Sequence, residues 1–180
     1  MKKFIAIIPL ILFLYSCNTG GDTEGKEFFA KLNNQKITSH ELKSDILESE
    51  IASGEIIYVP VYSSIYFRDD TKVYNLTVTL SIRNIDPINE IFIREINYNN
   101  SKGENVKKFL KMPVRVKPLE TLDLVIAEDD TTGGIGANFI VQWISKTNAI
   151  SPIVEAVMIS IRQGVGLSFT ENGRVIKKIK

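Results

Sequence analysis

The chain has 180 residues, of which 44% are hydrophobic, and its formal net charge is +1. A charge this close to balance argues against a nucleic-acid-binding function. One cysteine and one histidine leave no material for a disulfide, a thiolate zinc cluster or a multi-histidine metal site, so the fold must depend on burial of an apolar core.

The N-terminus is typical of a bacterial lipoprotein signal peptide. A basic pair at 2–3 precedes an apolar run at 4–14, which is shorter than the about 20 residues needed to cross a bilayer. The run ends in Leu-Tyr-Ser-Cys at 14–17, which resembles the lipobox whose cysteine is lipidated and becomes the new N-terminus. Residues 1–16 are therefore predicted to be a signal peptide and Cys17 the lipidation site. The alternative is an ordinary cleaved signal peptide followed by an incidental thiol.

The predicted localisation is the cell envelope, with the membrane as partner through the lipid anchor. Asn18 rather than Asp follows the cysteine, which by resemblance to envelope sorting signals favours the outer membrane, facing the periplasm, in a cell with two membranes. Removing residues 1–16 deletes Lys2 and Lys3 and leaves 20 basic against 21 acidic residues. Electrostatic attraction to a membrane is therefore not expected.

Two segments are predicted before the β-domain. Residues 17–38 comprise the lipidated cysteine and a flexible tether, because positions 18–25 are rich in Asn, Thr, Gly and Asp and lack apolar side chains. Residues 39–54 are predicted to form a short amphipathic helix at 39–52, ended by Gly54, because the run at 38–41 fits a capping box. Its apolar face consists of Leu42, Ile46, Leu47 and Ile51. This face is expected to dock on the β-domain, with a partner as the alternative. The segments at 139–143 and 153–161 are apolar on both faces, so they are expected to be central strands or to have their outer face covered, for which this helix is a candidate.

Residues 55–180 are predicted to form the β-domain. Positions 74–82 alternate strictly between apolar and polar side chains, which is typical of a half-buried antiparallel strand, and a turn at 84–87 leads to a strand at 91–98. Further strands are predicted at 56–61, 63–67, 106–110, 114–116, 122–127, 137–145, 154–162, 166–170 and 174–177. The last two strands are expected to form a hairpin through Asn172-Gly173, and Pro60 marks an edge, a bulge or a switch between sheets.

Many short strands with turn chemistry between them predict an all-β fold, an immunoglobulin-like antiparallel β-sandwich with a short N-terminal helix. A flattened barrel is the competing architecture. The basic C-terminal strand at 174–180 is expected to protect a sheet edge, or else to touch anionic lipid headgroups.

Four blocks carry a resemblance to a known family, at 58–66, 80–84, 130–139 and 152–158. With these in order, residues 55–177 resemble the bacterial envelope proteins catalogued as domain of unknown function 3124. The resemblance implies a compact secreted or lipid-anchored domain and brings no established activity. A broader similarity links 76–84 and 91–98 to the immunoglobulin-like sandwiches of water-stress and late-embryogenesis-abundant proteins, and it concerns the fold alone.

The loop at 128–138 is the best candidate for a site, because it combines three acids, two hydroxyls and three glycines before an apolar strand. Calcium binds six to eight oxygens, so Glu128, Asp129 and Asp130 are the candidate metal ligands. Asp130, Thr131, Asn138 and Trp143 are the candidate ligand-binding residues. The spacing matches no strict calcium motif.

Two other interpretations of this loop stay open. Gly133 to Gly136 could form a backbone nest for an anion, although the neighbouring acids oppose it. The loop could also be purely structural, with glycines at positive φ and Asp or Thr side chains capping backbone amides. Trp143 is expected to be a core residue first and a ligand contact second.

The sequence lacks the histidine and cysteine residues that common catalytic sites need. The only histidine, His40, lies outside the β-domain, so no Ser-His-Asp triad is available. Carboxylates could still converge as the acid and base of a glycosidase, the candidates being Asp123, Asp129, Asp130 and Glu155. Arg83 and Arg162 are expected to form ion pairs near these acids. The favoured function is a non-catalytic binding or structural module with an envelope protein or glycan partner, and the alternative is a small carboxylate-dependent hydrolase acting on an envelope glycan.

Overall fold

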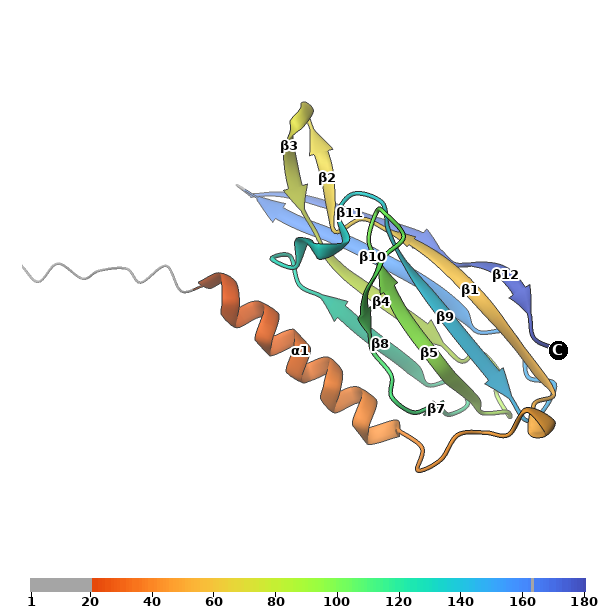
Figure 1. Cartoon of the computed structure of the whole chain (residues 1–180). Coiled ribbons are helices and arrows are strands. Elements are labelled where there is room, and N and C mark those ends of the chain that lie inside the picture. The colour runs from red at the N-terminus through yellow and green to blue at the C-terminus, as the bar shows by residue number, and fades with distance from the viewer. Residues whose placement is uncertain (1–20, 163) are drawn as a thin grey trace, which may run out of the picture.

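The computed structural model describes residues 21–162 and 164–180, and it shows two packed antiparallel sheets with one helix along their side (Figure 1). The large sheet has the order β12 (Arg174–Lys178), β1 (Ser53–Val61), β9 (Ala137–Ser145) and β5 (Ile91–Asn99), with β6 (Asn105–Lys108) and β7 (Val114–Val116) both pairing with β5. The small sheet has the order β11 (Val165–Asn172), β10 (Ile153–Arg162), β4 (Thr77–Arg83) and β8 (Thr121–Ile126). Among the described residues the two sheets share no strand, so the predicted all-β sandwich is confirmed.

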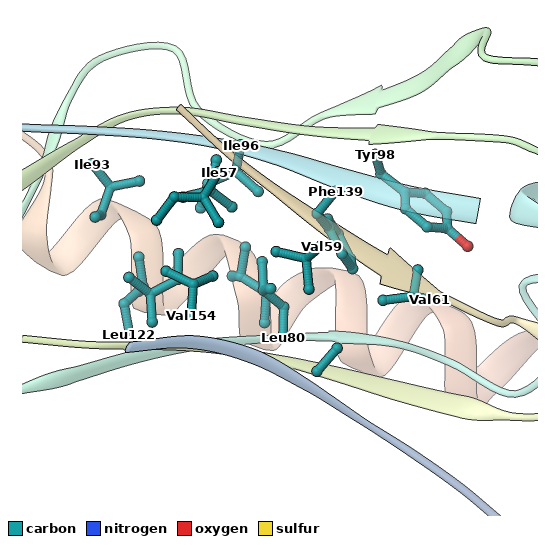
Figure 2. Packing of buried hydrophobic residues seen from close by; sticks show 14 of the residues in the cluster. Ile57, Val59, Val61, Leu80, Ile93, Ile96, Tyr98, Leu122, Phe139 and Val154 are labelled. Atoms are coloured by element: carbon teal, nitrogen blue, oxygen red, sulfur yellow. The ribbon is translucent and has the colours of Figure 1, made fainter. Parts of the chain in front are cut away.

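The core lies between the two sheets, where alternate side chains of each strand point inward. Figure 2 shows Val59 and Phe139 of the large sheet facing Leu80 of the small sheet, and all three are fully buried. Burying an aliphatic or aromatic side chain of this size stabilises a fold by about 1.5–3 kcal/mol. In a chain whose described part holds no cysteine, this packing is what joins the sheets.

The prediction of one continuous strand at 74–82 is wrong, because the segment belongs to two strands. β3 (Asp69–Asn75) pairs with β2 (Ser64–Phe67) in a hairpin of its own, and β4 begins at Thr77. Leu76 between them is fully buried, and its amide donates to the Ser63 carbonyl at 2.9 Å. The alternation continues through Leu76 because both strands stay extended, while the pairing partner changes there.

The hairpin predicted at Asn172-Gly173 is also wrong, since β11 and β12 belong to different sheets. Gly173 carries the chain across, and its amide donates to the Val154 carbonyl at 2.7 Å. A Cβ at this position would lie 2.6 Å from Cγ2 of Ile57. Close approach of the backbone therefore requires the glycine, which does not have a positive φ.

The free edge of the large sheet is basic. β12 pairs with β1 only along Glu55 to Tyr58, so Pro60 lies past its end, where β1 has a neighbour on the β9 side alone. Pro60 therefore stands where β1 borders a single strand, which is a position that tolerates proline. β12 is exposed throughout and carries Lys177 and Lys178, which fits the edge-protection interpretation.

The one long helix among the described residues is α1 (Gly21–His40), which lies where a tether was predicted. The predicted helix at 39–52 is wrong. Residues 41–52 are irregular apart from an isolated bridge between Glu41 and Val114 and one 3₁₀ turn, η1 (Glu48–Glu50). The residues at 38–41 that fit a capping box lie at the C-terminal end of α1, not at the start of a helix. Ser39 Oγ donates back to the Lys36 carbonyl at 2.8 Å and Thr38 Oγ1 to the Asn34 carbonyl at 2.9 Å. The predicted signal peptide at 1–16, Cys17 and the tether as far as residue 20 lie outside the described residues.

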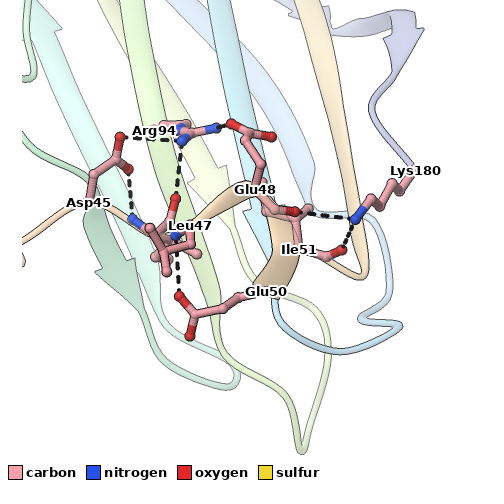
Figure 3. Close-up of polar contacts among 8 residues, drawn as sticks. Asp45, Leu47, Glu48, Glu50, Ile51, Arg94 and Lys180 are labelled. Carbon is pink, nitrogen blue, oxygen red and sulfur yellow. Dashed lines mark hydrogen bonds and ion pairs between the residues drawn. The ribbon is translucent and has the colours of Figure 1, made fainter.

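The segment at 41–52 nevertheless covers the outer face of the large sheet, as expected. Ile46 and Ile51 form a second buried cluster with Phe92 and Ile144. In Figure 3, Arg94 donates to the carboxylates of Asp45 and Glu48 and to the Ile46 carbonyl. Lys180 Nζ donates to the carbonyls of Glu48 at 3.2 Å and Ile51 at 2.7 Å. The segment at 41–52 is thus held by burial of its apolar side chains and by Arg94 and Lys180, which donate to its backbone carbonyls.

α1 docks along β8, the edge strand of the small sheet. The Asn33 side chain donates to the Val125 carbonyl at 2.7 Å and accepts from the Val125 amide at 3.0 Å, as a neighbouring strand would. Ile37, one turn later on the same helical face, is buried in the core. Lys36 pairs with Asp123. No helix within residues 21–162 and 164–180 is long and apolar enough to cross a membrane.

Candidate functional site

The loop at 128–138 enters β9 at the end of the sandwich where α1 begins (Figure 1). It contains a 3₁₀ turn, η2 (Thr131–Gly133). Lys26 Nζ of α1 lies 3.7 Å from Asp130 Oδ1, which ties the helix to the loop. The structure therefore brings the candidate site into contact with a segment that is about a hundred residues away in the sequence.

Asp130 is the N-cap of η2. Its Oδ1 accepts from the Thr132 amide at 3.3 Å and from the Thr132 hydroxyl at 2.6 Å. The side chain is largely buried, with Lys26 as its cation. These contacts match the capping role of the structural interpretation.

The glycines of the loop are held by serines from two other segments. Gly133 O accepts from the Ser101 amide at 3.0 Å and hydroxyl at 3.1 Å, and the Gly136 amide donates to Ser101 Oγ at 2.8 Å. Gly134 O accepts from the Ser63 amide at 3.1 Å and hydroxyl at 2.9 Å. Gly134 has φ +72°, which confirms the predicted positive φ at one glycine of the loop.

Tyr98 lies beneath this loop and was not expected there. It is fully buried, and a Cβ on Gly133 would lie 1.9 Å from its hydroxyl oxygen. Ser63 Oγ donates to Gly134 O, and the buried Tyr98 hydroxyl makes no hydrogen bond of normal geometry among the described residues. Burial raises the pKa of Tyr98. Strand periodicity marks Tyr98 as an inward-facing residue of β5 but does not reveal the loop above it.

Lys107 is paired with Tyr98 across β5 and β6. Its ammonium group lies 4.7 Å from the centre of the Phe109 ring. Partial burial lowers the pKa of Lys107, and the nearby Asp130 carboxylate opposes that shift. The loop end of the sandwich thus carries two lysines, Lys26 and Lys107, around one buried carboxylate.

The predicted ligand-binding set is not assembled. Asn138 is nearly buried, and its amide oxygen accepts from the Asn99 side chain at 2.9 Å. Thr131 is exposed on η2. Trp143 is buried in the core about 20 Å along β9 from the loop, where its indole N–H donates to Glu55 at 3.1 Å. Trp143 is therefore a core residue and takes no part in a site at the loop.

The candidate metal ligands do not converge either. Glu128 and Asp129 are half-buried, while Asp130 is occupied by Thr132 and Lys26. Within the described residues, no group of three or more His, Cys, Asp or Glu side chains could hold a metal ion. The geometry thus gives the calcium hypothesis no carboxylate cluster, and it favours the structural interpretation of the loop.

Two of the carboxylates considered for hydrolysis, Asp123 and Glu155, are engaged in ion pairs. Asp123 and Glu155 flank Ser81 in one row of the small sheet, which places them about 10 Å apart. Asp123 pairs with Lys36, and Glu155 accepts from Arg83 Nε at 2.9 Å, as expected for Arg83. His40 Nδ1 lies 3.6 Å from Glu120 on the α1 side. The side chain of Arg162 is outside the described part.

Comparison with known proteins gives a family and no activity. Residues 54–176 match the model of a family described as "Protein of unknown function (DUF3124)". No curated protein matches the chain. Among solved structures, "Crystal Structure of Thermotoga maritima 1070" is similar over 74% of this chain and 96% of that chain, with 12% identity and a TM-score of 0.41.

Proposed function

Because the chain belongs to the DUF3124 family of proteins of unknown function, we propose a function from its own residues: a lipid-anchored cell-envelope protein whose sandwich is a non-catalytic binding or structural module. The observation that carries the proposal is the lipobox-like run ending at Cys17. Only three residues separate this cysteine from Gly21, the first residue of α1. A lipid on Cys17 would therefore be joined almost directly to a helix that is itself docked on the sandwich.

The way α1 is held supports this anchoring role. Asn33 contacts β8 and Ile37 is buried in the core, so the second half of α1 is attached to the folded domain. A protein anchored through this helix keeps one end near the membrane, and the opposite end is free to face a partner (Figure 1). The partner class we propose is an envelope protein or glycan, with the outer membrane facing the periplasm as the location because Asn18 follows the cysteine.

The non-catalytic part of the proposal is supported by how the titratable groups are used. The carboxylates of Asp123 and Glu155 are each paired with a cation on a sheet face, and Asp130 caps a turn. These are contacts that hold a fold together. No observation favours the hydrolase alternative over this role.

The anchor is tested by Cys17→Ala, with Ser16→Ala as the matched control because it keeps a small residue before the cysteine. We expect the wild type and Ser16→Ala to fractionate with membranes and to carry acyl chains in mass spectra of the N-terminal peptide. Cys17→Ala should carry none and should leave the lipoprotein fraction. An unacylated wild-type protein, or a Cys17→Ala protein that is still acylated, would sink the proposal.

A further inference from the structure

Two hairpins extend from the sandwich at the end where α1 begins (Figure 1). One is β2–β3, which pairs with neither sheet. The other is the end of β10–β11, which continues past β4, whose last pair with β10 joins Thr77 to Ile159. Beyond Ile159, β10 has only β11 beside it. Contacts between Ser63 and Gly134 and between Lys26 and Asp130 place the hairpin base, the loop and the helix start together.

The overhanging end of β10–β11 is apolar on both faces. Ile161 is 74% exposed on the face that also carries Ile159, and Val165 is 73% exposed on the opposite face, with Leu167. Inside the sandwich, one of these faces would meet the core. Ser160, one residue past the last pair with β4, is still buried on this face, but beyond it Val165 is 73% exposed, so the end of β10–β11 exposes apolar side chains on both faces.

The neighbouring elements add aromatic side chains at the same end. Tyr66 and Val73 face each other across β2–β3, and both are exposed. Phe28 is exposed on the second turn of α1. The charges of the β2–β3 turn are balanced, since Lys72 lies 3.9 Å from Asp69. This end therefore offers apolar and aromatic contacts from three elements of the fold.

Exposure alone does not identify what covers these side chains. Ile88, in the turn before β5, is 81% exposed at the other end of the sandwich. The difference is the distance to the predicted anchor. Four steps along the chain join Cys17 to Gly21 and span at most about 14 Å when extended, so a bilayer holding the lipid must lie close to the start of α1.

We propose that the end of β10–β11, together with the tip of β2–β3 and Phe28, inserts into the headgroup layer of the membrane that holds the anchor. The inference rests on the lipid anchor of the proposed function. Apolar faces of interfacial elements bury about 5–10 Å into this layer, and aromatic rings such as that of Tyr66 suit its mixed polarity. The lipid holds the protein at the bilayer, and these contacts set its orientation, with Ile88 and its turn pointing away.

The test uses one fluorophore at a time. Cys17 is the only cysteine and is blocked when lipidated, so Ile161→Cys supplies a single reactive thiol for a polarity-sensitive dye. Ile88→Cys is the matched control, an equally exposed isoleucine at the opposite end. The full lipidated chain is placed in phosphatidylcholine vesicles with and without brominated lipid. We expect the dye at 161 to shift to shorter wavelength and to be quenched by brominated lipid, and the dye at 88 to do neither.

The outcomes separate this inference from the anchor. If the peptide containing Cys17 is acylated and the dye at 161 behaves like the dye at 88, insertion is wrong and the anchor stands. A blue shift that rises with protein concentration without vesicles would mean that a second copy covers the end, which also overturns the inference. If Cys17 is not acylated, the proposed function fails by mass spectrometry. The insertion, which rests on that anchor, is then overturned as well.

Discussion

Asn33→Ala should detach α1 from the edge of the sandwich. The Asn33 amide makes two hydrogen bonds to the backbone of Val125, at 2.7 and 3.0 Å, and it is buried. Each such bond contributes about 1 kcal/mol net, so the substitution removes about 2 kcal/mol from the docking of the helix. Replacing Asn by Ala in a helix returns about 0.5 kcal/mol of intrinsic propensity.

Asn34→Ala is the matched control, because Asn34 is the next residue of the same helix and its side chain is exposed. Both variants gain the same helix propensity, so the difference between them isolates the contact with Val125. We expect Asn33→Ala to be less stable than Asn34→Ala by about 2 kcal/mol in urea unfolding, which for a domain of this size corresponds to about 4–8 °C in Tm.

Hydrogen exchange places the effect on the strand. In the wild type the Val125 amide donates to Asn33 Oδ1, so its exchange should speed up in Asn33→Ala and stay slow in Asn34→Ala. Equal stability of the two variants, with unchanged exchange at Val125, would refute the reasoning. Residues 21–38 would then behave as part of the flexible tether that was predicted at 17–38.

Two further predictions concern the packed loop and the acidic turn. Gly133→Ala should destabilise the fold by about 1–3 kcal/mol, because its Cβ would lie 1.9 Å from the Tyr98 hydroxyl oxygen, and adding Tyr98→Phe should recover part of the loss. The control in thermal unfolding is Gly136→Ala, whose Cβ would lie 3.5 Å from its nearest neighbour. An equal loss of stability at both glycines would contradict the packing. Asp86 accepts from the backbone amides of Asn89, Ile150 and Ile88 at 2.8–3.0 Å, which holds the pKa of its carboxyl well below its usual range. A carboxylate whose pKa is lowered by folding stabilises the fold above its unfolded pKa of about 4, and this stabilisation is lost as the pH falls below that value. Tm should therefore drop steeply from about pH 4 downward in the wild type and in the control Asp70→Asn, and more gently in Asp86→Asn. Identical pH profiles of Tm would contradict this.

The strands were predictable because their signal is local. In β4 successive side chains point to opposite sides, so burial of one face produces a period of two in the sequence, while β9, which is covered on both faces, is a short apolar run. β9 begins and ends at the predicted residues, 137 and 145. The family resemblance read from four blocks is confirmed by the match over residues 54–176.

The turn and helix errors have a common physical cause, which is that the partner is distant in sequence. Asn172-Gly173 suits a tight hairpin, and only the positions of Ile57 and Val154 show that the glycine crosses between sheets. Residues 21–40 have a polar composition, and intrinsic helix propensity is a weak guide when docking supplies the stability. That docking depends on Val125, which is 92 residues from Asn33.

Some features of the candidate loop at 128–138 could be predicted from the sequence, and others depend on contacts with distant segments. Its glycines and acids mark a sharp, polar loop from the sequence alone, and the positive φ of Gly134 follows from residue type. Whether the oxygens of such a loop are free for a ligand depends on what lies against them. Ser63, Ser101 and Lys26 come from three other segments and take up those groups.

The sequence by itself determined the strand pattern, the shortage of catalytic histidine and thiol groups, and the lipobox-like run at Cys17, because each depends on residue type and local spacing. Only the tertiary structure decided where the helix lies, which strands share a sheet and how the loop at 128–138 is filled. Long-range packing chooses among local conformations that differ little in free energy, so those outcomes are set by contacts between segments far apart in the chain.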